Sequence, residues 1–227
     1  MNKQSWYFLG EGRKSPSYNM AMDELLLSFV ESKPVLRIYD WDVPTISIGY
    51  SQRLSEINTA GYRVVRRYTG GGVVFHDTSY TYSLVFPSSH LLVDKARLEG
   101  YKVVNEAVMS ALLPYNKNLY LYDRKLDDDT DLSIMACAEN PTFYDVMKNS
   151  EKVSGCAQRR NKNGLLVEGY IKKIALAQES LEKALKNTFA EYFNCSYESF
   201  PDKKDLFFQA EQLAKKKYLS KEWNFKR

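Results

Sequence analysis

The residues best suited to chemistry lie in one short stretch, which reads RRYTGGGVVFHD from Arg66 to Asp77. Three adjacent glycines can adopt backbone angles that other residues avoid, and they let a ligand approach the main chain. Arginine presents a planar fork of donors that suits a carboxylate or a phosphate. We therefore predict that this stretch holds an elongated, anionic small molecule against bare backbone.

The segments that flank the glycines, 62–67 and 73–75, are predicted strands. A strand after the glycines argues against a P-loop and against a dinucleotide fingerprint, because both need a helix at that point. Successive residues of a strand face opposite ways, so we expect only one of Arg66 and Arg67 in the site and the other paired with an acid on the outer face. His76 is interpreted as a structural hydrogen-bond node, without an acid–base role.

A second candidate begins at Lys152, which opens a predicted strand and is followed by small residues in the sequence KVSGCA. These side chains leave room for a ligand beside the lysine ammonium, which can hold a phosphate or polarise a carbonyl as negative charge develops. The alternative is a lysine that faces solvent, which is the commoner fate of this residue type.

A third candidate is Cys137, at the end of a predicted strand over 132–137. Most cysteines in such a place are small buried hydrophobic residues. If the fold brings Cys137 near Lys152, however, the pKa of the thiol would fall and the thiolate would be a competent nucleophile. The three cysteines and two histidines of the chain lack the spacing of metal ligands, so no metal site is predicted.

Hydrophobic periodicity predicts helices over 17–32, 95–113, 180–193 and 206–219, the first of them capped by Ser15 or Ser17. A hairpin is expected between 152–158 and 165–171, across the turn NKNG. The other predicted strands include a short edge strand at 6–9 and an alternating strand at 80–86. These elements favour an α+β domain with a largely antiparallel mixed sheet flanked by helices. We expect a catalytic domain over 1–195 and a basic helical extension over 196–227, packed on the same domain.

Composition limits the class of protein. The 227 residues are 44% hydrophobic and 26% charged, with a net charge of +4, which is ordinary for a globular protein. The lysine clusters near the C-terminus are interpreted as solvated helix faces rather than a nucleic-acid site, because no nucleic-acid motif accompanies them. No signal peptide or membrane span is predicted, and the unpaired cysteines favour a reducing cytoplasm.

Four ordered segments resemble the lipoate-protein ligase A and octanoyltransferase family, which is related to biotin protein ligases. They are residues 19–24, 36–52, 66–77 and 152–158, and together the match spans roughly residues 5–190. The resemblance implies a biotin/lipoate protein ligase catalytic-domain fold. It also implies an enzyme that attaches a lipoyl or octanoyl group to a lysine of lipoyl domains, in 2-oxoacid dehydrogenases or in the glycine cleavage H protein.

The resemblance also implies roles for particular residues. Lys152 would contact the acyl carbonyl or an activating phosphate, and the glycine loop with an arginine would bind the acyl group. The substrate-binding residues that it implies are Arg66, Arg67, Gly70, Gly71, Gly72, Val74, His76, Asp77, Ser154, Gly155 and Ala157. Two positions depart from the family pattern: Glu168 stands where a histidine is common, and Cys156 stands where a small polar residue is usual.

The family contains two chemistries. Residues 136–146 resemble the loop that carries the nucleophile in LipM-type octanoyltransferases, which implies a thioester on Cys137, acyl carrier protein as donor and no cofactor. The alternative is an ATP-dependent lipoate ligase, which needs ATP and Mg and in which Cys137 is a bystander. A third hypothesis is a non-catalytic module that binds lipoylated or acylated partners. No nucleic acid or membrane partner is expected.

Overall fold

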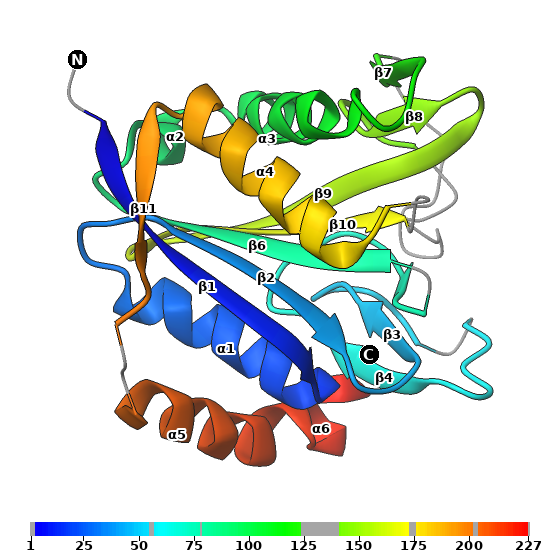
Figure 1. The fold of residues 1–227 in the computed structure, drawn as a ribbon. Helices are drawn as coiled ribbons and strands as arrows, with labels where there is room; N and C mark the ends of the chain where they lie inside the picture. Colours follow the sequence, from blue (N-terminus) through cyan, green and yellow to red (C-terminus); the bar gives the residue numbers. More distant parts are fainter. Residues whose placement is uncertain are drawn as a thin grey trace.

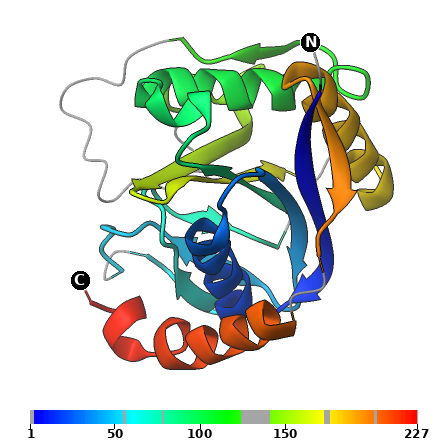
Figure 2. The ribbon, with the colours of Figure 1, turned by 90° about the vertical axis from the view of Figure 1, so that its left-hand side faces the viewer.

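The computed structural model describes residues 3–54, 57–77, 79–123, 141–172, 176–201 and 204–226. An eight-stranded mixed sheet forms the centre, with strand order β11-β1-β2-β6-β10-β9-β8-β7. Figure 1 shows α3 and α4 on one face of this sheet and α1 and α5 on the other, and Figure 2 shows the same layers from the side. A second sheet of three strands, β4-β3-β5, lies beside α1. The predicted cysteine-bearing strand at 132–137 lies outside the described residues.

The elements of the first half are β1 (Gln4–Lys14), α1 (Pro16–Phe29), β2 (Val35–Trp41), β3 (Thr45–Ile48), β4 (Arg63–Arg66), β5 (Val74–Phe75), β6 (Ser79–Pro87), α2 (Leu91–Asp94) and α3 (Arg97–Leu112). Those of the second half are β7 (Leu119–Leu121), β8 (Val146–Lys148), β9 (Glu151–Asn161), β10 (Gly164–Lys172), α4 (Gln178–Tyr192), β11 (Cys195–Ser199), α5 (Lys204–Leu213), the π-helical η1 (Ala214–Tyr218) and α6 (Lys221–Asn224).

The prediction of a largely antiparallel mixed sheet flanked by helices is confirmed. The β11–β1 and β1–β2 pairs are parallel, and the pairs from β2 through β6, β10, β9 and β8 to β7 are antiparallel. Both faces of the central strands are covered, so all seven residues of β2 are buried. The alternation predicted in β6 is also confirmed, because Tyr82, Leu84 and Phe86 enter the core under α3 and α4.

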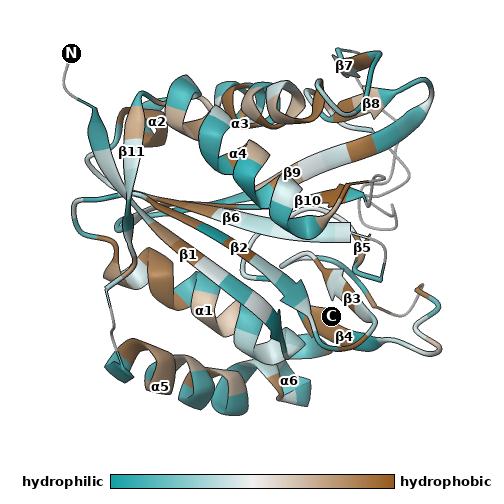
Figure 3. Ribbon diagram, viewed as in Figure 1, coloured by the Kyte–Doolittle hydropathy of each residue, from teal (hydrophilic) through white to brown (hydrophobic). Residues whose placement is uncertain are grey.

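The helices follow their hydrophobic spacing. In α4 the buried residues Leu181, Leu185 and Phe189 recur every four positions, and much of the rest of the helix is hydrophilic in Figure 3. The hydroxyl of Ser15 caps α1 by accepting from the Tyr18 amide, as predicted. The helix predicted over 95–113 begins at Arg97, and Ala96 is the exposed residue that precedes it.

Two features of the N- and C-terminal regions differ from prediction. The strand at 6–9 is longer, and it is not an edge, because β11 pairs with it in parallel through Gln4–Cys195 and the residues that follow. Parallel pairing between segments this far apart leaves no local pattern in either strand. After β11, α5 packs on α1, and η1 replaces the last turns of the helix predicted over 206–219.

The predicted hairpin is confirmed. β9 and β10 pair in antiparallel fashion from Asn161–Gly164 onward, with a two-residue turn between them. Gly164 has a φ of 148°, and a Cβ at this position would lie 1.9 Å from the carbonyl oxygen of Phe86. The hairpin therefore lies tightly against β6, and its inner face forms the floor of the site.

Candidate active site

A cavity of about 500 Å³ lies between the sheet face under α1 and the small sheet with its glycine loop. Two rows of side chains in cross-strand register lie on this face of the sheet. The first runs through Tyr39, Thr81, Tyr170 and Gly155, and the second through Arg37, Ser83, Glu168 and Ala157. β2, β6, β10 and β9 thus each place one residue in every row.

Most of the predicted binding residues meet at this cavity. Those that line it are Arg67, Gly70, Gly71, Gly72, Val74, His76, Lys152, Gly155 and Ala157. Three others point elsewhere: Asp77 is exposed and accepts from the hydroxyl of Tyr62, and the Ser154 hydroxyl donates to the carbonyl of Tyr170. The third is Arg66. Cys137 lies outside the described residues.

The two arginines divide as the strand geometry predicts. Arg67 reaches the cavity and donates to the carbonyls of Gly70 and Gly72 and to Ser47. The Arg66 guanidinium points away and donates to the main-chain carbonyls of Gly49, Tyr50, Gln52, Trp223 and Asn224. Arg67 therefore shapes the glycine loop from inside, and Arg66 anchors its base from outside.

The glycine loop lies in direct backbone contact with the end of β3. A Cβ on Gly49 would lie 1.7 Å from the carbonyl oxygen of Gly71, and Gly71 itself has a φ of 83°. Both positions therefore need glycine. Around Gly70, by contrast, a Cβ would meet no atom within 4 Å. Only part of the glycine run is thus demanded by the loop.

His76 is held as a neutral hydrogen-bond node, which agrees with its interpretation from the sequence. Its Nε2 lies 2.7 Å from the Ser47 hydroxyl, and its ring stacks on Trp41 with centroids 4.2 Å apart. Burial, and then the neighbouring Arg67, lower the pKa of His76 well below its ordinary value. A histidine in this state orients its neighbours and stays uncharged at neutral pH.

Lys152 is buried in the cavity wall, which excludes the alternative of a solvent-facing lysine. It is 4% exposed, and its Nζ lies 2.6 Å from Oδ2 of Asp145, which is 2% exposed. The same carboxylate oxygen accepts from the amide and the hydroxyl of Thr142. Burial raises the pKa of the Asp145 carboxyl, and the Lys152 ammonium opposes that shift. The ammonium is therefore fixed in place beside Tyr170 and the open cavity.

Gly155 is the reason that this ion pair fits. A Cβ on Gly155 would lie 2.6 Å from both Oδ1 of Asp145 and Cε of Lys152, so any side chain would push the pair apart. The small residues after Lys152 predict room for a ligand at this point, but the lysine's own stem partly fills that room. Asp145 was not among the predicted residues, although the spacing Thr142-x-x-Asp145 is typical of a local side-chain-to-backbone turn.

The ion pair gives a direct stability prediction. Asp145→Asn leaves a buried ammonium without its counter-charge, so we expect the free energy of unfolding to fall by about 3–5 kcal/mol. Urea denaturation measures this. The double variant Asp145→Asn/Lys152→Met should recover most of the loss, and Glu151→Gln, at an exposed neighbouring acid, should change little. A double variant no more stable than Asp145→Asn alone would contradict this account.

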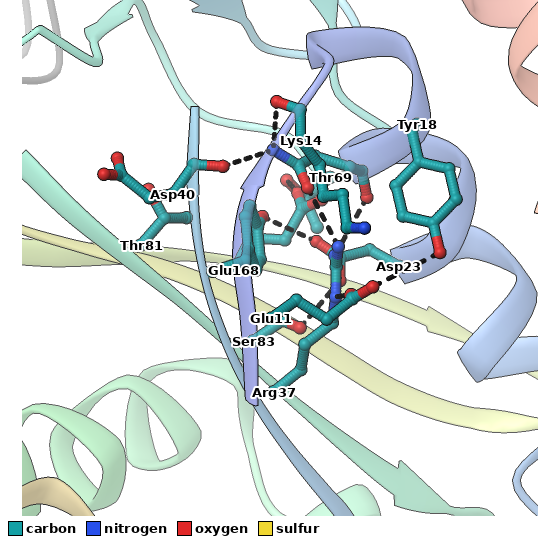
Figure 4. A network of polar contacts seen from close by, with 12 residues as sticks. Glu11, Lys14, Tyr18, Asp23, Arg37, Asp40, Thr69, Thr81, Ser83 and Glu168 are labelled. Carbon is teal, nitrogen blue, oxygen red and sulfur yellow. Dashed lines mark hydrogen bonds and ion pairs between the residues drawn. The ribbon is translucent and has the colours of Figure 1, made fainter. Parts of the chain in front are cut away.

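Glu168 brings a carboxyl group into the same wall. Its Oε2 accepts from the hydroxyl of Thr69 in the glycine loop, whereas its buried Oε1 has no hydrogen-bond partner. Burial, together with the nearby carboxylate of Asp23, raises the pKa of Glu168 to about 8. Figure 4 shows these groups within a polar network that extends to Arg37 and Glu11.

The remaining wall is largely aromatic and aliphatic, and no short sequence pattern marks its residues. Met20 comes from α1, Tyr39 and Trp41 from β2, Tyr101 from α3 and Tyr170 from β10. These side chains come together because of the order of strands in the sheet, which the sequence of one segment does not predict. Among the described residues no group of three or more acidic, histidine or cysteine side chains could hold a metal ion. None of the described helices has the length and apolar character to cross a membrane.

Comparison with known proteins shows which proteins the chain resembles. Residues 15–203 match the lipoyl protein ligase A/B catalytic domain. Octanoyltransferase LipM of Bacillus anthracis is 28% identical, with all of both chains covered. Octanoyltransferase LipM of Staphylococcus epidermidis is 36% identical over 73% of this chain and 65% of its own. A structure from an archaeal lipoylation system, described as a bi-partite lipoate protein ligase and its E2 lipoyl domain from Thermoplasma acidophilum, shares the fold. The TM-score is 0.76 at 21% identity, with 98% of this chain and 96% of that chain covered.

Proposed function

Because the chain belongs to the lipoyl protein ligase A/B catalytic domain family, we propose that it is an enzyme that transfers an octanoyl group to the acceptor lysine of lipoyl domains. The observation that carries this proposal is the buried Lys152, fixed by Asp145 at the wall of a cavity beneath the glycine loop. An ammonium held there stabilises a carbonyl oxygen as it becomes an oxyanion.

The cavity suits an eight-carbon chain. Its volume of about 500 Å³ lies within the usual size of small-molecule sites, and Met20, Trp41, Val74 and Ala157 supply apolar wall. Each methylene that leaves water contributes about 0.8 kcal/mol to binding. Chain length is therefore a determinant of specificity, because a shorter chain forgoes these contributions one by one.

The proposed reaction has two steps. The Cys137 thiolate attacks the thioester carbonyl of octanoyl-acyl carrier protein, the carrier's thiolate leaves, and the octanoyl group becomes a thioester on Cys137. The amine of the acceptor lysine then attacks this thioester and gives up a proton, an amide forms, and the Cys137 thiolate leaves. Both tetrahedral intermediates carry an oxyanion for Lys152 to stabilise. This route needs no ATP or metal, and its free thiol fits the cytoplasm expected from the sequence.

The alternative is a lipoate ligase that uses ATP and Mg, in which Lys152 contacts the activating phosphate. It is favoured by one observation, the fold shared with the lipoate protein ligase from Thermoplasma acidophilum. At 21% identity that likeness concerns the fold, whereas the relatives matched over the whole chain are octanoyltransferases. A non-catalytic binding module is the third candidate, and it predicts affinity for a lipoyl domain without turnover.

Intact-mass spectrometry after incubation with octanoyl-acyl carrier protein tests the reaction. We expect the protein to gain one octanoyl group, to lose it to an added lipoyl domain, and to gain none as the Cys137→Ser variant. Cys156→Ser is the matched control, because Cys156 also lines the cavity but burial and then Asp145 raise the pKa of its thiol. Modification of the lipoyl domain only when ATP and lipoate are supplied would establish the ligase instead. Inertness with both donors would leave the binding module.

A further inference from the structure

Glu168 is an acidic group in the cavity wall that the proposed reaction does not use. It sits in the second cross-strand row, between Ser83 of β6 and Ala157 of β9, and it is 5% exposed. Ala157 lines the cavity beside Glu168. Thr69 of the glycine loop donates a hydroxyl hydrogen bond to the Glu168 carboxyl. The carboxyl therefore lies in the part of the cavity wall formed by β9 and β10.

The charges around Glu168 leave it without a counter-ion. On α1, the Asp23 carboxylate is matched by Arg37 of β2, with Nη1 to Oδ1 at 2.7 Å. The same guanidinium also holds Glu11 of β1 at 2.7 Å, so one positive charge already faces two negative ones. A negative charge on Glu168, which is almost fully buried, would be a third in this group.

The charge of Arg67 in the glycine loop lowers the pKa of Glu168, but by less than burial and the Asp23 carboxylate raise it. The donors of Arg67 in the glycine loop go to Ser47 and to the carbonyls of Gly70 and Gly72. Tyr39 of β2 donates to Asp23, and Tyr218 of η1 donates to Glu24. Oε1 of Glu168 has no partner that would stabilise an ionised carboxylate. The neutral acid is the form that this environment favours, in agreement with a pKa raised to about 8.

We propose, on the basis of the octanoyl transfer proposed above, that Glu168 is a specificity-determining residue that admits an uncharged acyl chain only while its carboxyl carries a proton. A protonated carboxyl presents a small, neutral surface to the hydrocarbon. An ionised carboxylate at this position keeps water in the cavity, and an alkyl chain that displaces this water leaves the charge unsolvated. The enzyme with an ionised Glu168 therefore rejects the acyl chain that the enzyme with a protonated Glu168 binds.

Calorimetric titration with octanamide between pH 6.5 and 9.5 tests this inference without any chemical step. Octanamide does not ionise in this range, so any pH dependence comes from the protein. We expect a constant affinity below pH 7 and a loss of roughly tenfold per pH unit above pH 8, because binding is linked to one proton. In Glu168→Gln, which keeps the shape of the neutral acid, the affinity should be independent of pH. A Glu168→Gln variant with the wild-type slope, or a wild type with none, overturns the inference.

A second measurement needs neither variant nor ligand. The infrared carbonyl band of a protonated carboxyl should be present in the wild type at pH 7 and should disappear as the pH passes 8, and its absence at pH 7 would overturn the inference. The two proposals also fail separately. Octanamide that binds with the expected pH dependence to a protein that never transfers octanoate would refute the transferase and leave the role of Glu168 intact.

Discussion

Replacing Lys152 by methionine should lower the rate of octanoyl transfer by roughly a hundred- to a thousandfold, which is the usual cost of removing one oxyanion donor. Methionine keeps much of the apolar stem that passes over Gly155, so the shape of the wall is preserved while the ammonium is lost. Because the donor acts mainly on the transition state, kcat should fall far more than the affinity for the acyl donor. Single-turnover assays with octanoyl-acyl carrier protein measure both quantities.

The Lys152→Met experiment also needs a double variant and a control. Lys152→Met alone leaves a buried carboxylate at Asp145, so the double variant with Asp145→Asn separates loss of catalysis from loss of folding. Lys162→Met, in the exposed hairpin turn, is the matched control and should transfer at the wild-type rate. A folded double variant with near-normal kcat would show that Lys152 is structural, and the proposed chemistry would then need another electrophile.

Gly49→Ala should have the second largest effect, and Gly70→Ala should have almost none. A Cβ on Gly49 would lie 1.7 Å from the backbone oxygen of Gly71, so the glycine loop must move away from β3. For Gly49→Ala we expect the free energy of unfolding to fall by at least about 1–3 kcal/mol. The affinity for octanamide should drop at least about tenfold, because the glycine loop no longer covers the cavity. Gly70 has open space around it and should tolerate alanine within about 0.5 kcal/mol.

Thermal unfolding and calorimetric titration of the two variants, made side by side, check this prediction. The comparison is informative because both positions are glycines near the same loop and only one is in backbone contact. Equal losses of unfolding free energy in Gly49→Ala and Gly70→Ala would mean that alanine acts through the conformational entropy of the chain and not through the contact between Gly49 and Gly71. If both variants keep the wild-type stability and affinity, the glycine loop can move away from β3 with little loss of free energy.

The parts of the site that the sequence predicted are those whose chemistry lies within a few consecutive residues. The glycine run, Arg67 and Lys152 were found because each stands in a short segment of unusual composition. The hairpin below them was found because a turn sequence is local. Asp145 and the aromatic wall were missed because their proximity to Lys152 depends on the order of strands in the sheet, which is a non-local property.

Two further residues show the same limit. Strand alternation correctly separated Arg66 from Arg67, yet it could not say what Arg66 binds, because its partners at 223–224 are over 150 residues away. The His-to-Glu departure at residue 168 was visible in the sequence, but its meaning depends on Asp23 and Arg37, which approach from α1 and β2. The environment of a buried charge is a property of the assembled layers and not of its own strand.

The contacts of Arg66 also bear on the order in which the protein can become active during synthesis. Its backbone amide and carbonyl are paired with the side chains of Asn224 and Trp223, and its guanidinium joins their carbonyls to those of Gly49 and Gln52. A ribosome that has already released β3, β4 and the glycine run must still add about 150 residues before these partners emerge. Nascent chains therefore expose a glycine loop without the contacts that anchor its base, and we expect the proposed site to form only after residues 223–224 have emerged.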